Sequence, residues 1–205
     1  MTPTSEERVY VAIDVNNLWH SCREVFGVDA RVDYSAIKNL IQNRQTETRP
    51  RRLTLVAYAI SLPYRKVDDT GKTVKQYASR NSRFLYYLAA LGYDVKTRKM
   101  REEKGTKKAF HTDWDVGITI DAINAADDYD TFVLASGDGD YALLLRELHD
   151  RGKKTEVVTV EQRTSSLLYA VADSILFISK NEIFIETRTK QGDHGNRTKK
   201  DSPSE

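Results

Sequence analysis

The chain has 205 residues, of which 40% are hydrophobic and 30% charged, and its formal net charge is +2. This composition is typical of one globular domain, and no apolar run reaches the roughly 18 residues of a membrane-spanning helix, so we expect no membrane partner. The N-terminal residues lack the basic and apolar regions of a secretory signal, and the single cysteine, Cys22, excludes internal disulfides. Both features favour a cytoplasmic location, and we interpret Cys22 as a small buried filler rather than a nucleophile.

Apolar, β-branched runs alternate with segments of helical spacing along most of the chain. Asp33 is placed to cap the helix that follows it, and Gly92 and Gly152 end the helices that precede them. Strands are predicted at residues 9–15, 51–61, 93–100, 131–137, 154–160 and 175–179. Helices are predicted at residues 18–26, 34–44, 68–91, 113–126, 141–150 and 164–173.

This alternation of strands and helices indicates a parallel sheet with helices on both faces. We therefore predict an α/β fold, a three-layer α/β/α sandwich around a central, mostly parallel sheet of about five or six strands. One domain is expected at residues 8–186, after a short extension at residues 1–7. Residues 187–205 have no apolar side chain and are expected to form a disordered polar tail.

Four carboxylates fall where such a fold binds ligands. Asp14 ends the first strand, Asp138 and Asp140 directly follow the fourth, and Asp115 lies in the first turn of the helix before it. Because a parallel sheet brings its strand ends to one edge, these side chains can converge there. Carboxylates that lie close together repel one another unless a cation neutralises them, and hard oxygen ligands suit Mg²⁺ or Mn²⁺.

Each acid also has a purely structural interpretation. Asp14 could cap the helix that begins near Leu18, and either Asp138 or Asp140 the helix that begins near Tyr141. Asp113 is better explained as a helix cap than as a ligand. Asp121 lies roughly 120° from Asp115 around an ideal helix, so both cannot face one ion. We interpret Asp121 as a supporting residue of the site or as the partner of a basic side chain.

Several other chemistries are disfavoured by missing motifs. The chain contains neither a phosphate-binding G-x-x-x-x-G-K-[ST] loop nor a dinucleotide-binding G-x-G-x-x-G after the first strand. It has no G-x-S-x-G nucleophile elbow. Phosphatases of the haloacid dehalogenase type need D-x-D at the first strand, where this chain has D-V-N at residues 14–16. One cysteine and four scattered histidines argue against a zinc site.

Basic residues concentrate away from these acids, at residues 96–108 and 44–52, whereas acids concentrate at residues 113–140. Such segregation suits a protein that holds a cation and contacts a polyanion. A solvated surface without a partner is the alternative explanation for the basic runs.

Three stretches of the chain together resemble the NYN domain, specifically its LabA-like branch within the PIN-like nuclease superfamily. They are VYVAIDVNNLWHS, TDWDVGITIDAI and FVLASGDGDYALLLRELHDRGKKTEVV, and the resemblance extends from Val9 to Phe184. It implies a PIN-like fold and a ribonuclease that depends on a divalent metal ion. Transferred by position, the residues that bind the metal and carry catalysis are Asp14, Asp115, Asp138 and Asp140.

The resemblance also implies supporting roles for neighbouring residues. Asn17 would orient a ligand or a substrate phosphate, Asp121 matches a family aspartate of less clear role, and Ser136 precedes the last acidic pair. The family often has K-G-x-D before the helix acid, where this chain has T-D-W-D at residues 112–115. That departure leaves the acidic cluster intact and concerns only substrate contacts.

The function implied is hydrolysis of RNA phosphodiester bonds, with Mg²⁺ or Mn²⁺ activating water and stabilising charge on the phosphate. Trp19 and Tyr64 could stack on unpaired bases, although packing explains Trp19 equally well. The basic residues expected to contact single-stranded or structured RNA are Arg80, Arg83, Lys99, Arg101, Lys104, Lys107 and Lys108.

Two competing functions stay open at this point. The same fold could serve as a catalytically silent module that binds RNA or a protein in a regulatory role. A phosphatase acting on small phosphate esters is the other alternative. The oligomeric state is also open between a monomer and a homodimer.

Overall fold

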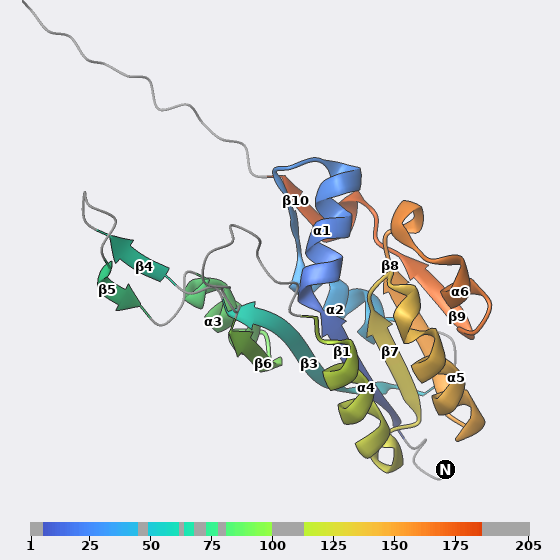
Figure 1. Ribbon diagram of the computed structural model, residues 1–205. Helices are drawn as coiled ribbons and strands as arrows, with labels where there is room; N and C mark the ends of the chain where they lie inside the picture. The colour runs from blue at the N-terminus through green and yellow to red at the C-terminus, as the bar shows by residue number, and fades with distance from the viewer. Residues whose placement is uncertain are drawn as a thin grey trace, which may run out of the picture.

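A computed structural model describes most of the chain, and the elements it contains can be followed in Figure 1. The described residues are 6–44, 49–61, 64–67, 73–77, 81–99 and 113–185. Their strands are β1 (Glu7–Asp14), β2 (Ala30–Val32), β3 (Arg51–Ser61), β4 (Tyr64–Val67), β5 (Thr73–Tyr77), β6 (Asp94–Lys99), β7 (Thr131–Ala135), β8 (Lys154–Thr159), β9 (Ser174–Phe177) and β10 (Ile183–Ile185). The α-helices are α1 (Val15–Phe26), α2 (Tyr34–Gln42), α3 (Ser82–Ala90), α4 (Asp115–Asn124), α5 (Ala142–Asp150) and α6 (Ser166–Tyr169). Short 3-10 helices are η1 (Ala126–Asp128), η2 (Gly139–Tyr141), η3 (Glu161–Arg163) and η4 (Lys180–Glu182).

The main sheet has six strands in the order β6-β3-β1-β7-β8-β9, and every neighbouring pair is parallel. The chain builds outward from β1 through β3 to β6, then returns to β7 on the other side of β1 and continues to β8 and β9. The direction of winding therefore reverses between β1 and β7. Ligands of open parallel sheets bind at such a reversal, beyond the carboxyl ends of the strands.

Helices cover both faces of the sheet, which confirms the predicted three-layer α/β/α fold (Figure 1). Side chains of β1 alternate between the two faces: Val11 and Ile13 pack in one core with α1, α2 and α3, and Tyr10 and Ala12 in the other with α4 and α5. Since both faces of β1 are buried, its sequence is a nearly continuous apolar run. This explains why the strand could be recognised from sequence.

The predicted helix at residues 68–91 is wrong over its first part. Among the described residues of this range, helix is confined to α3, and β4 and β5 pair as an antiparallel hairpin before it. Thr73, Val74 and Tyr77 in β5 favour strand structure, and Asp69 and Gly71 between the two strands are typical turn residues. The helical spacing of α3 also continues into the residues before it. The strand propensity of β5 outweighs that spacing.

The predicted helix at residues 164–173 is also too long, because α6 ends at Tyr169. Asp173 accepts hydrogen bonds from the backbone N–H and the hydroxyl of Thr155 at the start of β8. These contacts direct the chain into the edge strand β9 instead of continuing the helix. The short strands β2 and β10, which pair antiparallel outside the main sheet, were not predicted.

A buried ionic network ties together the amino-terminal ends of the strands. Arg51 on β3 donates to Glu7 on β1 at 2.9 Å and to Glu156 on β8 at 2.8 and 3.1 Å. Thr131 donates to Glu7, and Arg44 forms a second ion pair with Glu156. Two residues of the basic group at 44–52 therefore serve the sheet, at the end opposite to the acidic cluster, rather than a polyanion.

Cys22 lies fully buried in α1, as expected of a filler, and this has a measurable consequence. Burial raises the pKa of its thiol to about 12, so the reactive thiolate is scarce at neutral pH. We expect the native chain to resist a thiol reagent such as dithionitrobenzoate, and the denatured chain to react with one equivalent. Rapid labelling of the native chain would contradict this placement.

Candidate metal centre

Asp14 is the last residue of β1 and also the cap of α1. Its Oδ1 accepts a hydrogen bond from the backbone N–H of Asn17 at 3.0 Å, which satisfies a free donor of the first turn. The helix therefore begins at Val15, three residues before the predicted start at Leu18. The structure confirms the capping interpretation of Asp14, whose side chain is buried where the sheet reverses direction.

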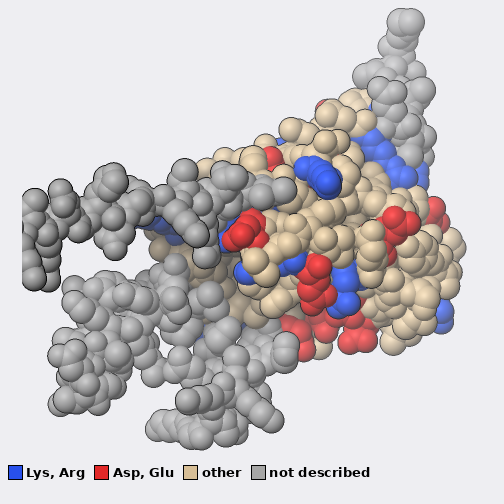
Figure 2. All heavy atoms as spheres, turned by 90° about the horizontal axis from the view of Figure 1, so that it is seen from above, with Lys and Arg blue, Asp and Glu red and all other residues tan. Residues whose placement is uncertain are grey.

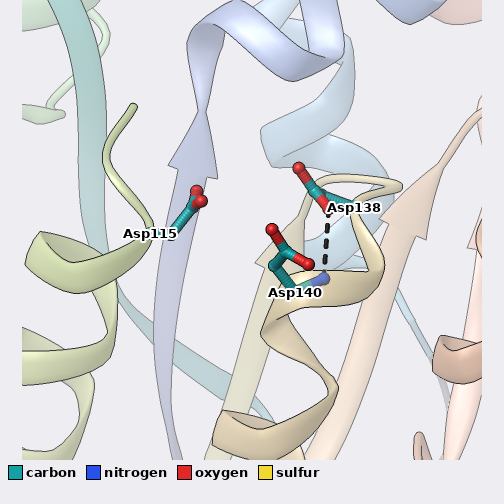
Figure 3. A group of neighbouring side chains, drawn as sticks. All are labelled: Asp115, Asp138 and Asp140. Carbon is teal, nitrogen blue, oxygen red and sulfur yellow. Dashed lines mark hydrogen bonds between the residues drawn. The ribbon is translucent and has the colours of Figure 1, made fainter. Parts of the chain in front are cut away.

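Asp138 and Asp140 follow β7 in a tight turn whose hydrogen bonds hold both side chains. Ser136, fully buried, accepts from the backbone N–H of Asp138 at 3.2 Å. The Asp138 carboxylate in turn accepts from the backbone N–H of Asp140 at 3.1 Å, shown as the dashed line in Figure 3. Asp138 thus caps η2, and the buried Ser136 hydroxyl supports the same turn.

Asp115, in the first turn of α4, approaches this turn from the other side. Asp115, Asp138 and Asp140 each offer a carboxylate oxygen, and these three oxygens lie within 4.8 Å of one another. Figure 3 shows Asp115 on one side and the other two opposite it, with the carboxyl groups turned toward the space between them. Among the described residues, these three form the candidate group for a metal ion.

Asp14 lies beside this group, and Tyr141 connects the two. The Tyr141 hydroxyl donates to Asp14 Oδ2 at 3.0 Å, and Tyr141 itself directly follows Asp140 in η2. Burial raises the pKa of Asp14, the contacts with Asn17 and Tyr141 oppose the rise, and the nearby charges of Asp115 and Asp138 add to it. Burial likewise raises the pKa of Asp115. The site therefore brings several carboxylates close together, and a bound cation would reduce the electrostatic repulsion between them.

Asn17 and two glycines hold the turn in place. Asn17 Oδ1 accepts from the backbone N–H of Gly137 at 3.0 Å, so it links α1 to the turn after β7. A Cβ atom on Gly137 would collide with the carbonyl oxygen of Arg163, and one on Gly139 would collide with Ser165. Neither glycine has a positive φ, so close packing is what requires glycine at both positions.

Asp121 is not one of the three acids in the candidate metal group. Its carboxylate accepts from Lys96 at 2.7 Å and from the Tyr58 hydroxyl at 3.0 Å. The contact with Lys96 agrees with the second of the two interpretations of Asp121, the partner of a basic side chain. The predicted capping role of Asp113 is wrong: Trp114 holds the capping position of α4, and Asp113 is exposed.

The predicted RNA-contacting residues are only partly within the structure. Arg83 on α3 and Lys99 at the end of β6 are exposed. Figure 2, a view onto the carboxyl ends of the strands, shows described basic side chains singly or in small groups rather than as one continuous surface. Trp19 is half-buried with the Arg23 guanidinium 4.5 Å from its ring centre. Five of the predicted contacts, and the side chain of Tyr64, lie outside the described residues: Arg80, Arg101, Lys104, Lys107 and Lys108.

Tyr141 is the site residue that sequence reasoning missed. It follows Asp140 directly, where the sequence pattern predicts only the first residue of a helix. The available signal was a tyrosine hydroxyl next to a predicted acidic cluster, because a buried tyrosine hydroxyl needs a hydrogen-bond partner.

The raised pKa values of Asp14 and Asp115 predict how pH affects metal binding. A metal ion needs the ionised carboxylates, so protons compete with it once the pH falls into the range of these raised values, above the ordinary 3.8. We expect the affinity for Mn²⁺ to weaken as pH falls from about 7 to about 4. In the metal-free chain the sign reverses: the raised values contribute stability below 3.8 that is lost as pH rises through the folded values.

Calorimetric titration with Mn²⁺ and thermal unfolding in a chelator measure the two trends. The variant Asp14→Asn should show a smaller pH dependence in both. An affinity for Mn²⁺ that stays constant over this range would contradict the shifted values.

Comparisons with known proteins agree with this architecture. The family model described as "NYN domain" matches residues 8–179. A crystal structure of a protein of unknown function from Vibrio parahaemolyticus is 28% identical, with a TM-score of 0.66, over 90% of this chain and 100% of that one. The low amplitude and bright protein LabA of Synechococcus elongatus is 29% identical over 103 residues, 48% of this chain and 55% of that protein. The matched region thus spans about half the length of this curated relative.

Within the part of the chain that the structure describes, no helix is long and apolar enough to cross a membrane. The six-stranded parallel sheet and its flanking helices give the PIN-like fold that the resemblance implied, and the acidic group fits a metal-dependent nuclease. Because the family model matches residues 8–179, most of the 205 residues, the chain belongs to the NYN domain family.

Proposed function

We propose that the chain is a divalent-metal-dependent endoribonuclease that hydrolyses RNA phosphodiester bonds at the acidic cluster. The observation that carries this proposal is the convergence of Asp115, Asp138 and Asp140 within 4.8 Å, where the sheet reverses direction, in an NYN family member. Carboxylate oxygens suit Mg²⁺ and Mn²⁺, which take one or two direct carboxylates and keep several waters. These three side chains, with Asp14 beside them, would hold the ion.

A bound ion of this kind activates water and stabilises the charge that develops on the phosphate and the leaving oxygen. The chain contributes the position of its ligands and access to them. Asp14 is buried and fixed by two hydrogen bonds, whereas Asp140 is exposed and lies where a substrate can approach. Arg83 and Lys99, which are both exposed, would contact phosphates of the RNA.

The same proposal covers the organisation and surroundings of the chain. We place the nuclease domain at residues 8–186, between an extension at 1–7 and a polar tail at 187–205. Its substrate would be single-stranded or structured RNA in the cytoplasm, with further phosphate contacts from the basic stretch that ends at residue 108. Whether it acts as a monomer or a homodimer is a separate question for sedimentation.

The direct test is cleavage of a labelled RNA by the purified chain with Mn²⁺, with Mg²⁺ and with EDTA. We expect internal cuts with either metal and none with EDTA. A small phosphate monoester such as p-nitrophenyl phosphate should not be hydrolysed. Cleavage that persists in EDTA, or at an equal rate in Asp14→Asn and Asp138→Asn, would contradict the proposal.

The test also separates the competing functions. A chain that binds RNA without cutting it, with an affinity that falls steeply as salt rises, would be the silent binding module. Activity on monoesters alone would identify a phosphatase.

A further inference from the structure

The hydroxyl of Tyr141 holds an acid that lies beside the candidate metal group. Tyr141 is fully buried in η2, and its hydroxyl donates to Asp14 Oδ2 at 3.0 Å. Asp14 ends β1, whereas Tyr141 directly follows Asp140 in the turn after β7, far away in the sequence. One hydrogen bond therefore links the carboxylate outside the candidate metal group to the turn that carries Asp138 and Asp140.

We infer that Tyr141 is a positioning residue of the metal centre, which fixes the Asp14 carboxylate relative to the group of Asp115, Asp138 and Asp140. This inference rests on the proposed function, because it assumes that the group binds a metal. The negative charges of Asp14 and Asp115 repel each other, so nothing in their own chemistry keeps Asp14 beside the group. The neutral hydroxyl of Tyr141 donates to the Asp14 carboxylate and holds it in place.

The two oxygens of Asp14 show what the contact achieves. Oδ1 is held by the backbone N–H of Asn17, and Oδ2 by Tyr141, so the plane of the carboxylate is fixed at both ends. Each oxygen keeps a second lone pair, which a metal or its bound water can use. Without the hydroxyl, only the Asn17 contact remains and the carboxylate can rotate away from the group. Partners of this kind typically change metal affinity by about 10- to 100-fold when removed.

The inference differs from an ordinary structural role, since every buried tyrosine hydroxyl needs a partner. Tyr129 provides a matched control: it is also almost fully buried, and its hydroxyl donates to the backbone carbonyl of Ala122 at 2.8 Å, away from the acids. Tyr141→Phe and Tyr129→Phe each remove one oxygen atom from a buried ring. If Tyr141 serves only stability, the two variants should behave alike toward metal.

The experiment is calorimetric titration of Mn²⁺ into the native chain, Tyr141→Phe and Tyr129→Phe, with thermal unfolding in EDTA to confirm that each is folded. We expect Tyr141→Phe to bind about 10- to 100-fold more weakly and Tyr129→Phe to bind as the native chain does. Equal affinity of Tyr141→Phe and the native chain overturns this inference alone. A native chain that binds no Mn²⁺ overturns the proposed function and the inference with it.

A double-mutant cycle tests whether Tyr141 acts through Asp14. In the background of Asp14→Asn, we expect Tyr141→Phe to cause a much smaller further loss of affinity than in the native chain. Fully additive losses would contradict the inference. Should Tyr141→Phe not fold, Mn²⁺ titration of the native chain by ultraviolet difference absorption replaces it: metal binding should perturb a buried tyrosine, and an unchanged tyrosine spectrum overturns the inference.

Discussion

Replacing Asp138 with asparagine should abolish most cleavage activity and yet make the metal-free chain more stable. Asparagine keeps the side-chain oxygen that accepts from the backbone N–H of Asp140, so the cap of η2 survives. What is lost is one negative charge from a group of three carboxylates within 4.8 Å. We expect kcat/KM on RNA to fall by at least about 100-fold, because even residues that only support metal ligands cost about 10- to 100-fold.

The gain in stability has the same origin as the loss of activity. Removing one of several mutually repelling charges should raise the free energy of unfolding in EDTA by about 0.5–2 kcal/mol. Functional sites commonly lower the stability of a protein in this way. Asp127→Asn is the matched control, since Asp127 is an exposed acid in η1, outside the cluster, and should change neither quantity. Asp138→Asn that cleaves like the native chain, or that unfolds more readily in EDTA, would contradict this explanation.

Replacing Arg51 with leucine should have the largest effect on stability. Arg51 is the cation between Glu7 and Glu156, and the contacts with these carboxylates raise its pKa although burial lowers it. Without it, Glu7 loses the ion pair with Arg51, whereas Glu156 keeps its ion pair with Arg44. Removing one partner of a buried ion pair typically costs about 3–5 kcal/mol, chiefly because a charge is left uncompensated away from water. For a chain of this length, that corresponds to a fall in Tm of about 6–20 °C.

Arg8→Leu is the control for Arg51→Leu. Arg8 pairs with Asp130 at 2.7 Å, near the same end of the sheet, but both side chains are more than a third exposed. Exposed pairs of this kind contribute little to stability because water screens them, so the loss of Arg8 should hardly lower Tm. Arg51→Leu with a loss as small as that of Arg8→Leu would show that the buried network is not important for stability.

The positions of the acids could be predicted because they depend on features that act locally. Continuous apolar runs mark strands buried on both faces, and Asp14 and the pair after β7 stand directly at the ends of such runs. Parallel pairing then places these ends at one edge of the sheet, whatever the rest of the chain does. Asp115 could be placed through its position at a helix start.

Other features depended on contacts between distant segments, which no local pattern carries. The β4–β5 hairpin could not be predicted, because helical spacing continues by chance from α3 into the residues before it. From sequence, Arg51 is predicted to be part of a basic surface. Its true partners, Glu7 and Glu156, come close to it only in the folded chain. From sequence, Tyr141 is predicted only as a helix start. Its hydroxyl donates a hydrogen bond to Asp14, which is 127 residues away in the sequence.

The most direct test of the metal centre is a crystal structure of the chain with Mn²⁺, with the ion located by its anomalous scattering. We expect at least one peak between Asp115, Asp138 and Asp140, at the short distances of carboxylate coordination, with Asp14 binding it directly or through water. A crystal with Mn²⁺ in the solution and no peak at this edge of the sheet, or with its only peak elsewhere, would contradict the central claim.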